Sequence, residues 1–271
     1  MNKGYLLFAL DNQEVNYSKL ATACALTIKL TQPDEYNSVS VITNNTGYFD
    51  KDLFDHIIPA GLLSGMDARS RAYDCTPYDE TVLLDSDMLF LKPMDHYWDI
   101  VKDMDLFIST SPQTHRGVSF QLGFYRNVFI SNKLPDVYNA WTYFKKSETA
   151  RQFFELVKLM TDNPQEFINV MIPNSGLTSL PTDEAFALAL IQLELEDKVT
   201  LPNIDFPRIT HMKPAVQRWS NRVSDWHEKL RFTVDEQGQV KLGVWGQSEL
   251  LHYVKKELIT DDVIKTLRSA L

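Results

Sequence analysis

Cysteine is scarce in this sequence, with two residues among 271. Cys24 and Cys75 are widely separated, and each falls in a segment whose apolar residues have helical spacing. Neither belongs to a cluster of cysteines and histidines of the kind that binds metals. We therefore expect two buried free thiols and no cysteine-based metal site.

Positive charge is in deficit as well, with 27 lysines and arginines against 36 aspartates and glutamates and a formal net charge of -9. Such a chain has no overall electrostatic attraction to nucleic acids or to anionic membranes. A local basic strip is still compatible with this balance. The charge therefore argues against a broad nucleic-acid-binding face.

Long apolar runs are missing too. The run at residues 5–10 is interrupted by Asp11 before it reaches the length of a signal peptide or a membrane span. No internal repeat, low-complexity tract or linker divides the chain. The sequence thus predicts a cytoplasmic protein without a membrane segment, folded as a single domain over residues 1–271.

Short apolar runs alternate with segments of helical periodicity along most of the chain. Strands are expected at residues 5–10, 39–43, 57–59, 81–84, 106–110, 137–144 and 206–210, and a hairpin at residues 231–244. Helices are expected at residues 17–30, 68–75, 147–160, 182–193 and 259–271. Because strand, helix and strand in succession form right-handed parallel crossovers, the fold class is α/β, a mixed and mainly parallel sheet flanked by helices.

The most informative motif is Asp85-Ser86-Asp87, which directly follows the apolar run at residues 81–84. In open α/β sheets, ligands bind beyond the carboxyl ends of the strands. Alternation along an extended backbone places both carboxylates on one side, where they can face one oxygen-seeking divalent cation. The alternative is a simple turn, since Asp and Ser side chains hydrogen-bond nearby backbone amides.

In this order, the segments resemble those of GT-A glycosyltransferases, and among them family 8-like retaining enzymes such as glycogenins and bacterial galactosyltransferases. Residues 78–88 look like the stretch that leads into the Asp-x-Asp of these enzymes. Residues 137–147 are similar to the strand that follows it, with Trp141 in place of a glycine. Residues 182–186 correspond to an acceptor-side segment, and residues 209–214 to a late His with a Lys-Pro, here at a shorter spacing.

The resemblance implies a GT-A (Rossmann-like) fold with a variable C-terminal part. Residues 1–100 would form the half that binds the nucleotide sugar, and residues 101–271 the acceptor side. It also implies a Mn²⁺ or Mg²⁺ cofactor held by Asp85, Asp87 and His211, with manganese tolerating imidazole better. The implied donor is a nucleoside-diphosphate sugar, with a UDP-sugar favoured.

The resemblance also implies residues that bind the donor, some at the end of the strand expected at residues 5–10 and others around the diphosphate. They are Leu10, Asp11, Tyr17, Arg71, Ser86 and Lys213. A carboxylate such as Asp11 can accept hydrogen bonds from ribose hydroxyls. Alternatively, Asp11 is an ordinary loop residue, Tyr17 belongs to the core, and the two cationic side chains are solvated surface charges.

Catalytic roles are implied for Asp183 and Glu184, at the start of the helix expected at residues 182–193. The alternative is that both stabilise this helix by placing negative charge at its N-terminus. Asn139 and Trp141 would belong to the acceptor site, where an indole can stack on a sugar or base. Trp141 can equally fill the core.

The acceptor is suggested by residues 70–81, which also look like GT-A-like proteins of tailed bacteriophages, some of whose relatives modify hydroxymethylated DNA bases. Transfer to such a base, with retention of anomeric configuration, is one expectation. A surface glycan or lipopolysaccharide is the other. A local basic excess with interleaved aromatic residues falls in residues 111–127 and 214–229, and it comprises Arg116, Arg126, Arg218, Arg222 and Lys229 with Trp219 and Trp226.

Two other functions are alternatives to a glycosyltransferase. A haloacid-dehalogenase-type phosphatase also carries Asp-x-Asp after an apolar strand, but its motif continues with small residues and usually stands on the first strand. Here Met88 and Leu89 follow, and two strands precede. A non-catalytic binder of sugar nucleotides or glycans is the alternative from another functional class, and donor hydrolysis with manganese discriminates it.

Overall fold

The structure is a computed structural model that describes residues 2–63, 65–110, 112–113, 126–200, 207–211, 232–253 and 255–271. Its strands are β1 (Lys3–Ala9), β2 (Val39–Thr43), β3 (His56–Pro59), β4 (Glu80–Leu84), β5 (Met88–Phe90), β6 (Leu106–Thr110), β7 (Val137–Lys145), β8 (Ile209–His211), β9 (Phe232–Val234), β10 (Val240–Leu242), β11 (Trp245–Gly246) and β12 (Leu250–His252). Its α-helices are α1 (Tyr17–Thr31), α2 (Ala72–Cys75), α3 (His96–Val101), α4 (Asn127–Asn132), α5 (Glu148–Asp162), α6 (Pro164–Met171), α7 (Thr182–Gln192) and α9 (Asp261–Ala270). Short 3₁₀ turns are η1 (Asp34–Tyr36), η2 (Thr46–Tyr48), η3 (Met66–Arg71) and η5 (Lys256–Leu258).

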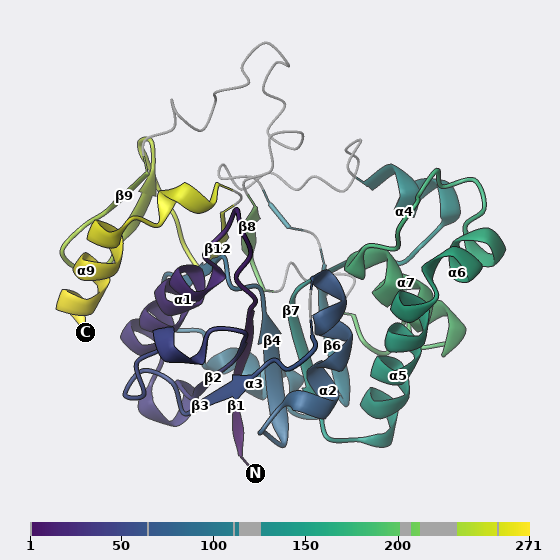
Figure 1. Ribbon diagram of the computed structural model, residues 1–271, viewed down its shortest axis with the longest axis horizontal. Helices are drawn as coiled ribbons and strands as arrows, with labels where there is room; N and C mark the ends of the chain where they lie inside the picture. Colours follow the sequence, from purple (N-terminus) through teal and green to yellow (C-terminus); the bar gives the residue numbers. More distant parts are fainter. Residues whose placement is uncertain are drawn as a thin grey trace.

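The central sheet has six strands in the order β3-β2-β1-β4-β7-β6. β1 to β4 are parallel, whereas β7 lies antiparallel between β4 and β6. In Figure 1 the parallel strands run upward from the N-terminus, so their carboxyl ends lie near β8 and β12. The mixed, mainly parallel α/β sheet expected from the sequence is confirmed.

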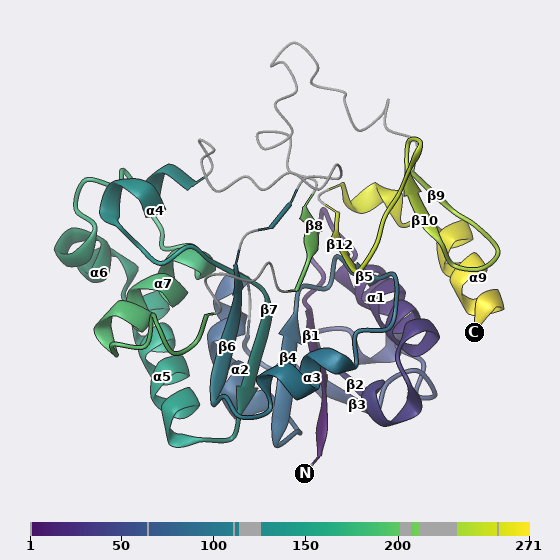
Figure 2. The same cartoon turned by 180° about the vertical axis from the view of Figure 1, so that it is seen from behind.

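Apolar residues on both faces of this sheet explain why it is covered by helices on both sides. On β1, Tyr5 and Leu7 face one core, which α1, α3 and α9 complete. Leu6 faces the other core, formed with α2, α5 and α7. Figures 1 and 2 show α2 and α3 on opposite faces of the sheet.

A second, three-stranded sheet has the order β5-β12-β8 and stands next to the carboxyl end of β4. β12 pairs antiparallel with β5 and parallel with β8. The third sheet, β11-β10-β9, contains the hairpin expected around residues 235–238. The second sheet matters for function, because it brings residues near 90, 210 and 250 together.

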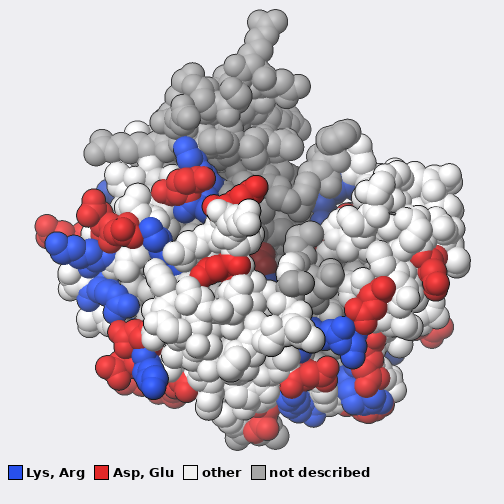
Figure 3. Space-filling model, in the orientation of Figure 1, with Lys and Arg blue, Asp and Glu red and all other residues white. Residues whose placement is uncertain are grey.

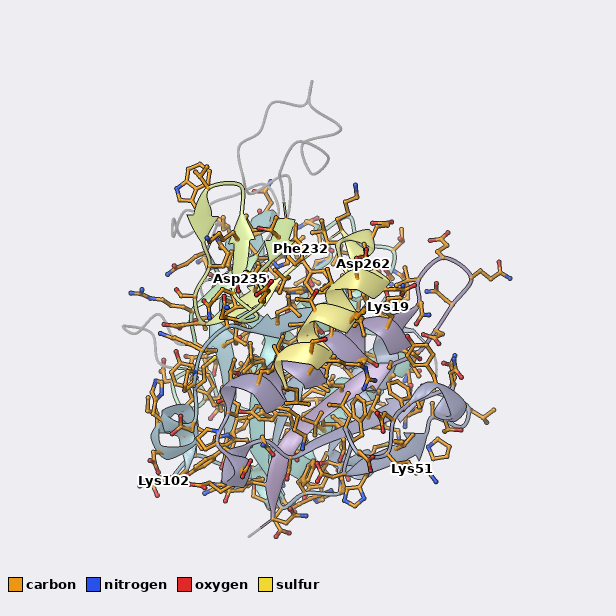
Figure 4. All side chains as sticks on the ribbon, turned by 90° about the vertical axis from the view of Figure 1, so that its left-hand side faces the viewer. Lys19, Lys51, Lys102, Phe232, Asp235 and Asp262 are labelled. Atoms are coloured by element: carbon orange, nitrogen blue, oxygen red, sulfur yellow. The ribbon has the colours of Figure 1, made fainter. Side chains whose placement is uncertain are left out.

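The C-terminal helix α9 packs on α1, as expected of an amphipathic helix. Thr260 caps α9 with its side chain, and Lys19 Nζ of α1 lies 2.6 Å from Asp261 Oδ1. Figure 4 looks onto this pair of helices, with Lys19 and Asp262 labelled, and with Phe232 and Asp235 on the adjacent hairpin. The last helix therefore closes one side of the molecule.

The surface agrees with the charge balance of the sequence. On the face shown in Figure 3, acidic and basic side chains of the described residues are interspersed, without a broad basic area. Both cysteines are free, as expected, with Cys24 buried and Cys75 half-buried. Among the helices that the structure describes, none has the length and apolar character needed to cross a membrane.

Candidate metal and nucleotide-sugar site

The two carboxylates of the Asp-x-Asp motif lie where the chain passes from the first sheet to the second. β4 ends at Leu84, and the Asp85 amide still donates to Ala140 O of β7 at 3.2 Å. β5 begins at Met88 in the second sheet. The motif is thus held at both ends by backbone pairing, at the carboxyl end of a parallel strand.

His252 completes the group because of the strand register in the second sheet. His252 is opposite Met88 of β5, and the next amide, that of Tyr253, donates to Asp87 O at 3.1 Å. Nε2 of His252 consequently lies 3.1 Å from Asp87 Oδ2 and 3.7 Å from Asp85 Oδ2. One ligand atom from each of Asp85, Asp87 and His252 lies within 4.8 Å of the others, so these three can hold a divalent ion.

His211, the third ligand expected from the resemblance, lies on β8, the strand that pairs with β12 and its His252. It is the last residue of β8 rather than a loop residue, and the register places it opposite His252. Its side chain is buried and faces His252 and the Tyr138 hydroxyl. Among the described residues, the histidine that groups with Asp85 and Asp87 as a possible metal ligand is therefore His252. Ligation by His211 stays a prediction.

Two cationic side chains balance the carboxylates. Lys256, in η5, directs its ammonium to Asp87 Oδ2. Arg69, in η3, donates to Asp85 Oδ1 at 2.5 Å and to the carbonyl oxygen of Asn139. Burial lowers the pKa of Lys256, opposed by the Asp85 charge. Because an ammonium group already occupies a cation position beside Asp87, the site fits a positively charged ligand.

These residues line one pocket of about 560 Å³. Leu10, Asp11 and Tyr17 line the same pocket, as do Asp85 and Ser86. The sequence predicted Leu10, Asp11, Tyr17 and Ser86 as donor residues and Asp85 as a metal ligand, and the structure brings these five together. Their roles toward a nucleotide stay predictions.

The Asp11 carboxylate is engaged within its own loop. It accepts from the Ser18 amide at 2.7 Å, from the Ser18 hydroxyl at 2.8 Å and from Asn45 Nδ2 at 3.0 Å. Ser86 Oγ donates to the carbonyl oxygen of Phe8. Burial raises the pKa of Tyr17, and the Asp85 charge adds to the increase. Asp11 and Ser86 thus fix the pocket walls, whereas Tyr17 stands close to the metal-type group.

Arg71 does not reach the pocket. Its guanidinium lies 3.1 Å from Asp162 Oδ1, at the end of α5. Arg69, two residues earlier, lines the pocket instead. Contact of Arg71 with a diphosphate therefore stays a prediction, and Arg69 is a second candidate for it. Lys213, the other expected diphosphate contact, lies outside the described residues.

Asp183 connects to the site through the backbone of β7. Its Oδ1 accepts from the Asn139 amide at 2.8 Å, and the Asn139 carbonyl accepts from Arg69. Its Oδ2 lies 3.4 Å from Arg126. A continuous chain of contacts therefore runs from Asp183 through Asn139 and Arg69 to Asp85. Glu184 follows in the first turn of α7, half-buried.

Trp141 belongs to the core. Its side chain is 2% exposed, and its ring meets Phe107 edge-on at a centroid distance of 5.7 Å. β7 is the antiparallel neighbour of β4, with Trp141 opposite Leu84. The structure thus places Trp141 in the core, which is the alternative that the sequence left open, and a stacking role at an acceptor stays a prediction.

Most of the basic strip expected for the acceptor lies outside the described residues: Arg116, Arg218, Arg222, Lys229, Trp219 and Trp226. Arg126 is described and is buried. Its Nε donates to Asp136 Oδ1 at 2.7 Å, and its guanidinium stands 3.6 Å from the Phe129 ring centre. Arg126 therefore ties α4 to β7.

Sequence reasoning missed His252, Lys256 and Arg69. A signal was present for the first, because Leu250 and Leu251 form a short apolar run that ends in His252, just as Ile209 and Thr210 precede His211. The pairing of two short strands far apart in sequence cannot be read from periodicity.

No protein-family model matches the chain, and no curated protein matches its sequence. Among solved structures, the glycosyltransferase GlyE of Streptococcus pneumoniae TIGR4 is similar, at 12% identity and a TM-score of 0.43. The similarity covers 74% of this chain and 45% of that chain, so this chain spans less than half the length of GlyE.

Proposed function

We propose that the protein is a metal-dependent glycosyltransferase that moves a sugar from a nucleoside-diphosphate sugar to a hydroxyl acceptor. The observation that carries the proposal is the meeting of Asp85, Asp87 and His252 in one pocket with the cations of Arg69 and Lys256. Carboxylates with an imidazole suit Mn²⁺ or Mg²⁺, and adjacent cations suit a diphosphate.

Each part of the pocket has a role in this proposal. A bound Mn²⁺ or Mg²⁺ would supply Lewis-acid stabilisation to the negative charge that develops on the departing nucleoside diphosphate. Lys256, released from Asp87, pairs with a phosphate oxygen, and Arg69 keeps the Asp85 carboxylate oriented. The nucleoside lies along Leu10, Asp11 and Tyr17, where a UDP-sugar is the first donor to test.

On the acceptor side, the proposal assigns Asp183 to the donor sugar or the acceptor hydroxyl. The chain of contacts from Asp183 through Asn139 to Arg69 supports this position. Transfer would retain the anomeric configuration, as the resemblance implies. NMR of the fresh product tests this, and an inverted product would reject the family 8-like part of the proposal.

The acceptor itself is proposed from two classes, a hydroxymethylated base of phage DNA and a surface glycan. The interspersed charges of Figure 3 give no broad support to a DNA-binding face. A base-modifying enzyme needs only a local groove, because the target nucleotide can be flipped out of the helix. A mass-spectrometric acceptor screen that contains both classes separates them.

The first test is hydrolysis of the donor. A panel of UDP-, GDP- and CDP-sugars is incubated with the full chain and Mn²⁺ or Mg²⁺, and release of nucleoside diphosphate is measured. The proposal expects release that depends on the metal and stops when EDTA is added. Donor binding without any release, even when acceptors are present, would instead support a non-catalytic binder.

The non-catalytic binder is the second candidate, and one observation favours it. Both carboxylate oxygens of Asp183 already face groups of the chain itself, the Asn139 amide and the Arg126 guanidinium. A carboxylate held in this way has little freedom to serve as a catalytic group. Donor hydrolysis by the wild type and by Asp183→Asn distinguishes the two, because a transferase releases nucleoside diphosphate and the variant releases less, whereas a binder binds the donor and releases none in either protein.

A further inference from the structure

Behind the His252 ring, on the side away from the two carboxylates, lie two buried side chains from other strands. The Tyr138 hydroxyl of β7 is within hydrogen-bonding distance of Nδ1 of His252 and also of Nδ1 of His211. The two Nδ1 atoms are 3.2 Å apart. With exposed fractions of 3% for Tyr138 and 1% for His211, these contacts lie in the interior of the protein.

Three separate strands position this arrangement. The parallel register of β12 with β8 places His252 next to His211. Tyr138 enters from the first sheet, where its carbonyl oxygen accepts from Ser109 Oγ. The His211 and His252 rings are 4.6 Å apart at a steep angle of 79°. The three polar groups therefore meet at a junction between the two sheets.

The direction of the hydrogen bonds follows from the chemistry of a metal-binding imidazole. Nε2 of His252 faces the carboxylates, so it must carry a lone pair when it binds a metal, and the ring hydrogen must then be on Nδ1. That Nδ1 hydrogen needs an acceptor, and the Tyr138 oxygen is in place. The phenol hydrogen can then be donated to Nδ1 of His211.

We propose that Tyr138 and His211 are positioning residues, which hold His252 in the tautomer and orientation that expose Nε2 to a metal ion. The inference rests on the metal site of the proposed function. It gives His211 a role behind the ligand rather than as a ligand. Outer partners of this kind typically account for a 10- to 100-fold change in metal affinity.

The first test is the affinity for Mn²⁺ without nucleotide, measured on the full chain by electron paramagnetic resonance. Tyr138→Phe removes the hydroxyl and keeps the ring, and it should weaken Mn²⁺ binding roughly 10- to 100-fold. Tyr253→Phe is the matched control. Its buried hydroxyl has no hydrogen-bond partner among the described residues, although it directly follows His252.

A second pair of variants tests His211. His211→Asn can place an amide oxygen near the position of Nδ1 and should keep most of the affinity, whereas His211→Leu should lose it to the same extent as Tyr138→Phe. If Asn and Leu weaken binding equally, the hydrogen-bond role of His211 is refuted. Circular dichroism confirms that each variant is folded before its affinity is compared.

The outcomes separate the inference from the proposed function. If the wild-type protein binds Mn²⁺ and Tyr138→Phe binds it equally well, only the positioning role is wrong. Equal losses in Tyr138→Phe and Tyr253→Phe would also overturn it, since packing would then be the cause. If the wild-type protein binds no divalent ion, the metal site itself is refuted, and the positioning role with it.

Discussion

At the scale of the residue, Lys256 is the side chain whose role changes with the state of the site. Its ammonium now contacts Asp87, and burial lowers its pKa. A metal ion must displace it from Asp87, whereas a diphosphate gains a cationic partner. Lys256→Met should therefore tighten binding of Mn²⁺ alone. It should weaken binding of UDP with Mn²⁺ by about 10- to 100-fold, the range for a hydrogen bond to a charged group.

Isothermal titration calorimetry measures both affinities. Lys255→Met makes the same change in net charge at the neighbouring position, and the structure gives no contact between Lys255 and Asp87. Unchanged or weaker binding of Mn²⁺ alone in the Lys256 variant would show that the ammonium does not compete with the metal, and unchanged or tighter binding of UDP with Mn²⁺ would show that it does not contact the diphosphate.

A substitution of Trp141 separates two explanations of its role, packing in the core and stacking on an acceptor. Because its side chain is 2% exposed and packs against Phe107, Trp141→Ala should destabilise the protein by roughly 3–5 kcal/mol, as removal of a large aromatic side chain from a core does. Urea unfolding followed by circular dichroism measures the change. A stable variant that has lost only acceptor transfer would support the stacking role.

The candidate site was only partly predictable from residues. Asp85 and Asp87 were identified because their spacing and the preceding apolar run are local signals. His252 was missed because only the pairing of β12 with β5 brings it to Asp87. Arg69 and Arg71 are separated by one residue, and the geometry of a 3₁₀ turn decides which of them reaches the pocket.

At the scale of the element, β1 depends on a residue without a side chain. A Cβ on Gly4 would come closer than 3.0 Å to the Tyr78 ring, which is held by a hydrogen bond of 2.6 Å between Tyr78 and Ser40. Gly4→Ala should therefore destabilise the protein by about 1–3 kcal/mol, the usual range for overpacking. Thermal unfolding measures it, with Gly47→Ala as the control, since an added Cβ there meets nothing within 4 Å.

Elements with a strong local pattern were predicted well. β2 and β6 have the expected bounds, and α5 begins after Ser147, whose side chain accepts from the Ala150 amide. The helix expected at residues 68–75 is instead a 3₁₀ turn followed by the short α2. The antiparallel direction of β7 was not predictable, because periodicity carries no information on strand direction.

At the scale of the whole molecule, the pocket draws residues from Phe8 to Lys256 and so joins distant parts of the chain. A ligand that binds only the folded protein stabilises it by about 2.7 kcal/mol at a concentration of 100 times its Kd. Mn²⁺ with UDP should therefore raise the unfolding midpoint in urea. If the urea midpoint is the same with and without Mn²⁺ and UDP, at concentrations where binding is saturated, binding of these ligands to a pocket that exists only in the folded protein is contradicted.

The central claim is that the Asp85, Asp87 and His252 group binds the divalent ion that carries the donor diphosphate. Electron paramagnetic resonance of Mn²⁺ in the presence of UDP tests it most directly, on the wild-type protein, on Asp87→Asn and on Asp162→Asn as a control distant from the pocket. The account predicts one ion per chain for the wild type and the control, and an affinity more than about 100-fold weaker for Asp87→Asn, beyond the loss expected for an outer partner. Equal affinities in all three proteins, or no bound ion in the wild type, would contradict it.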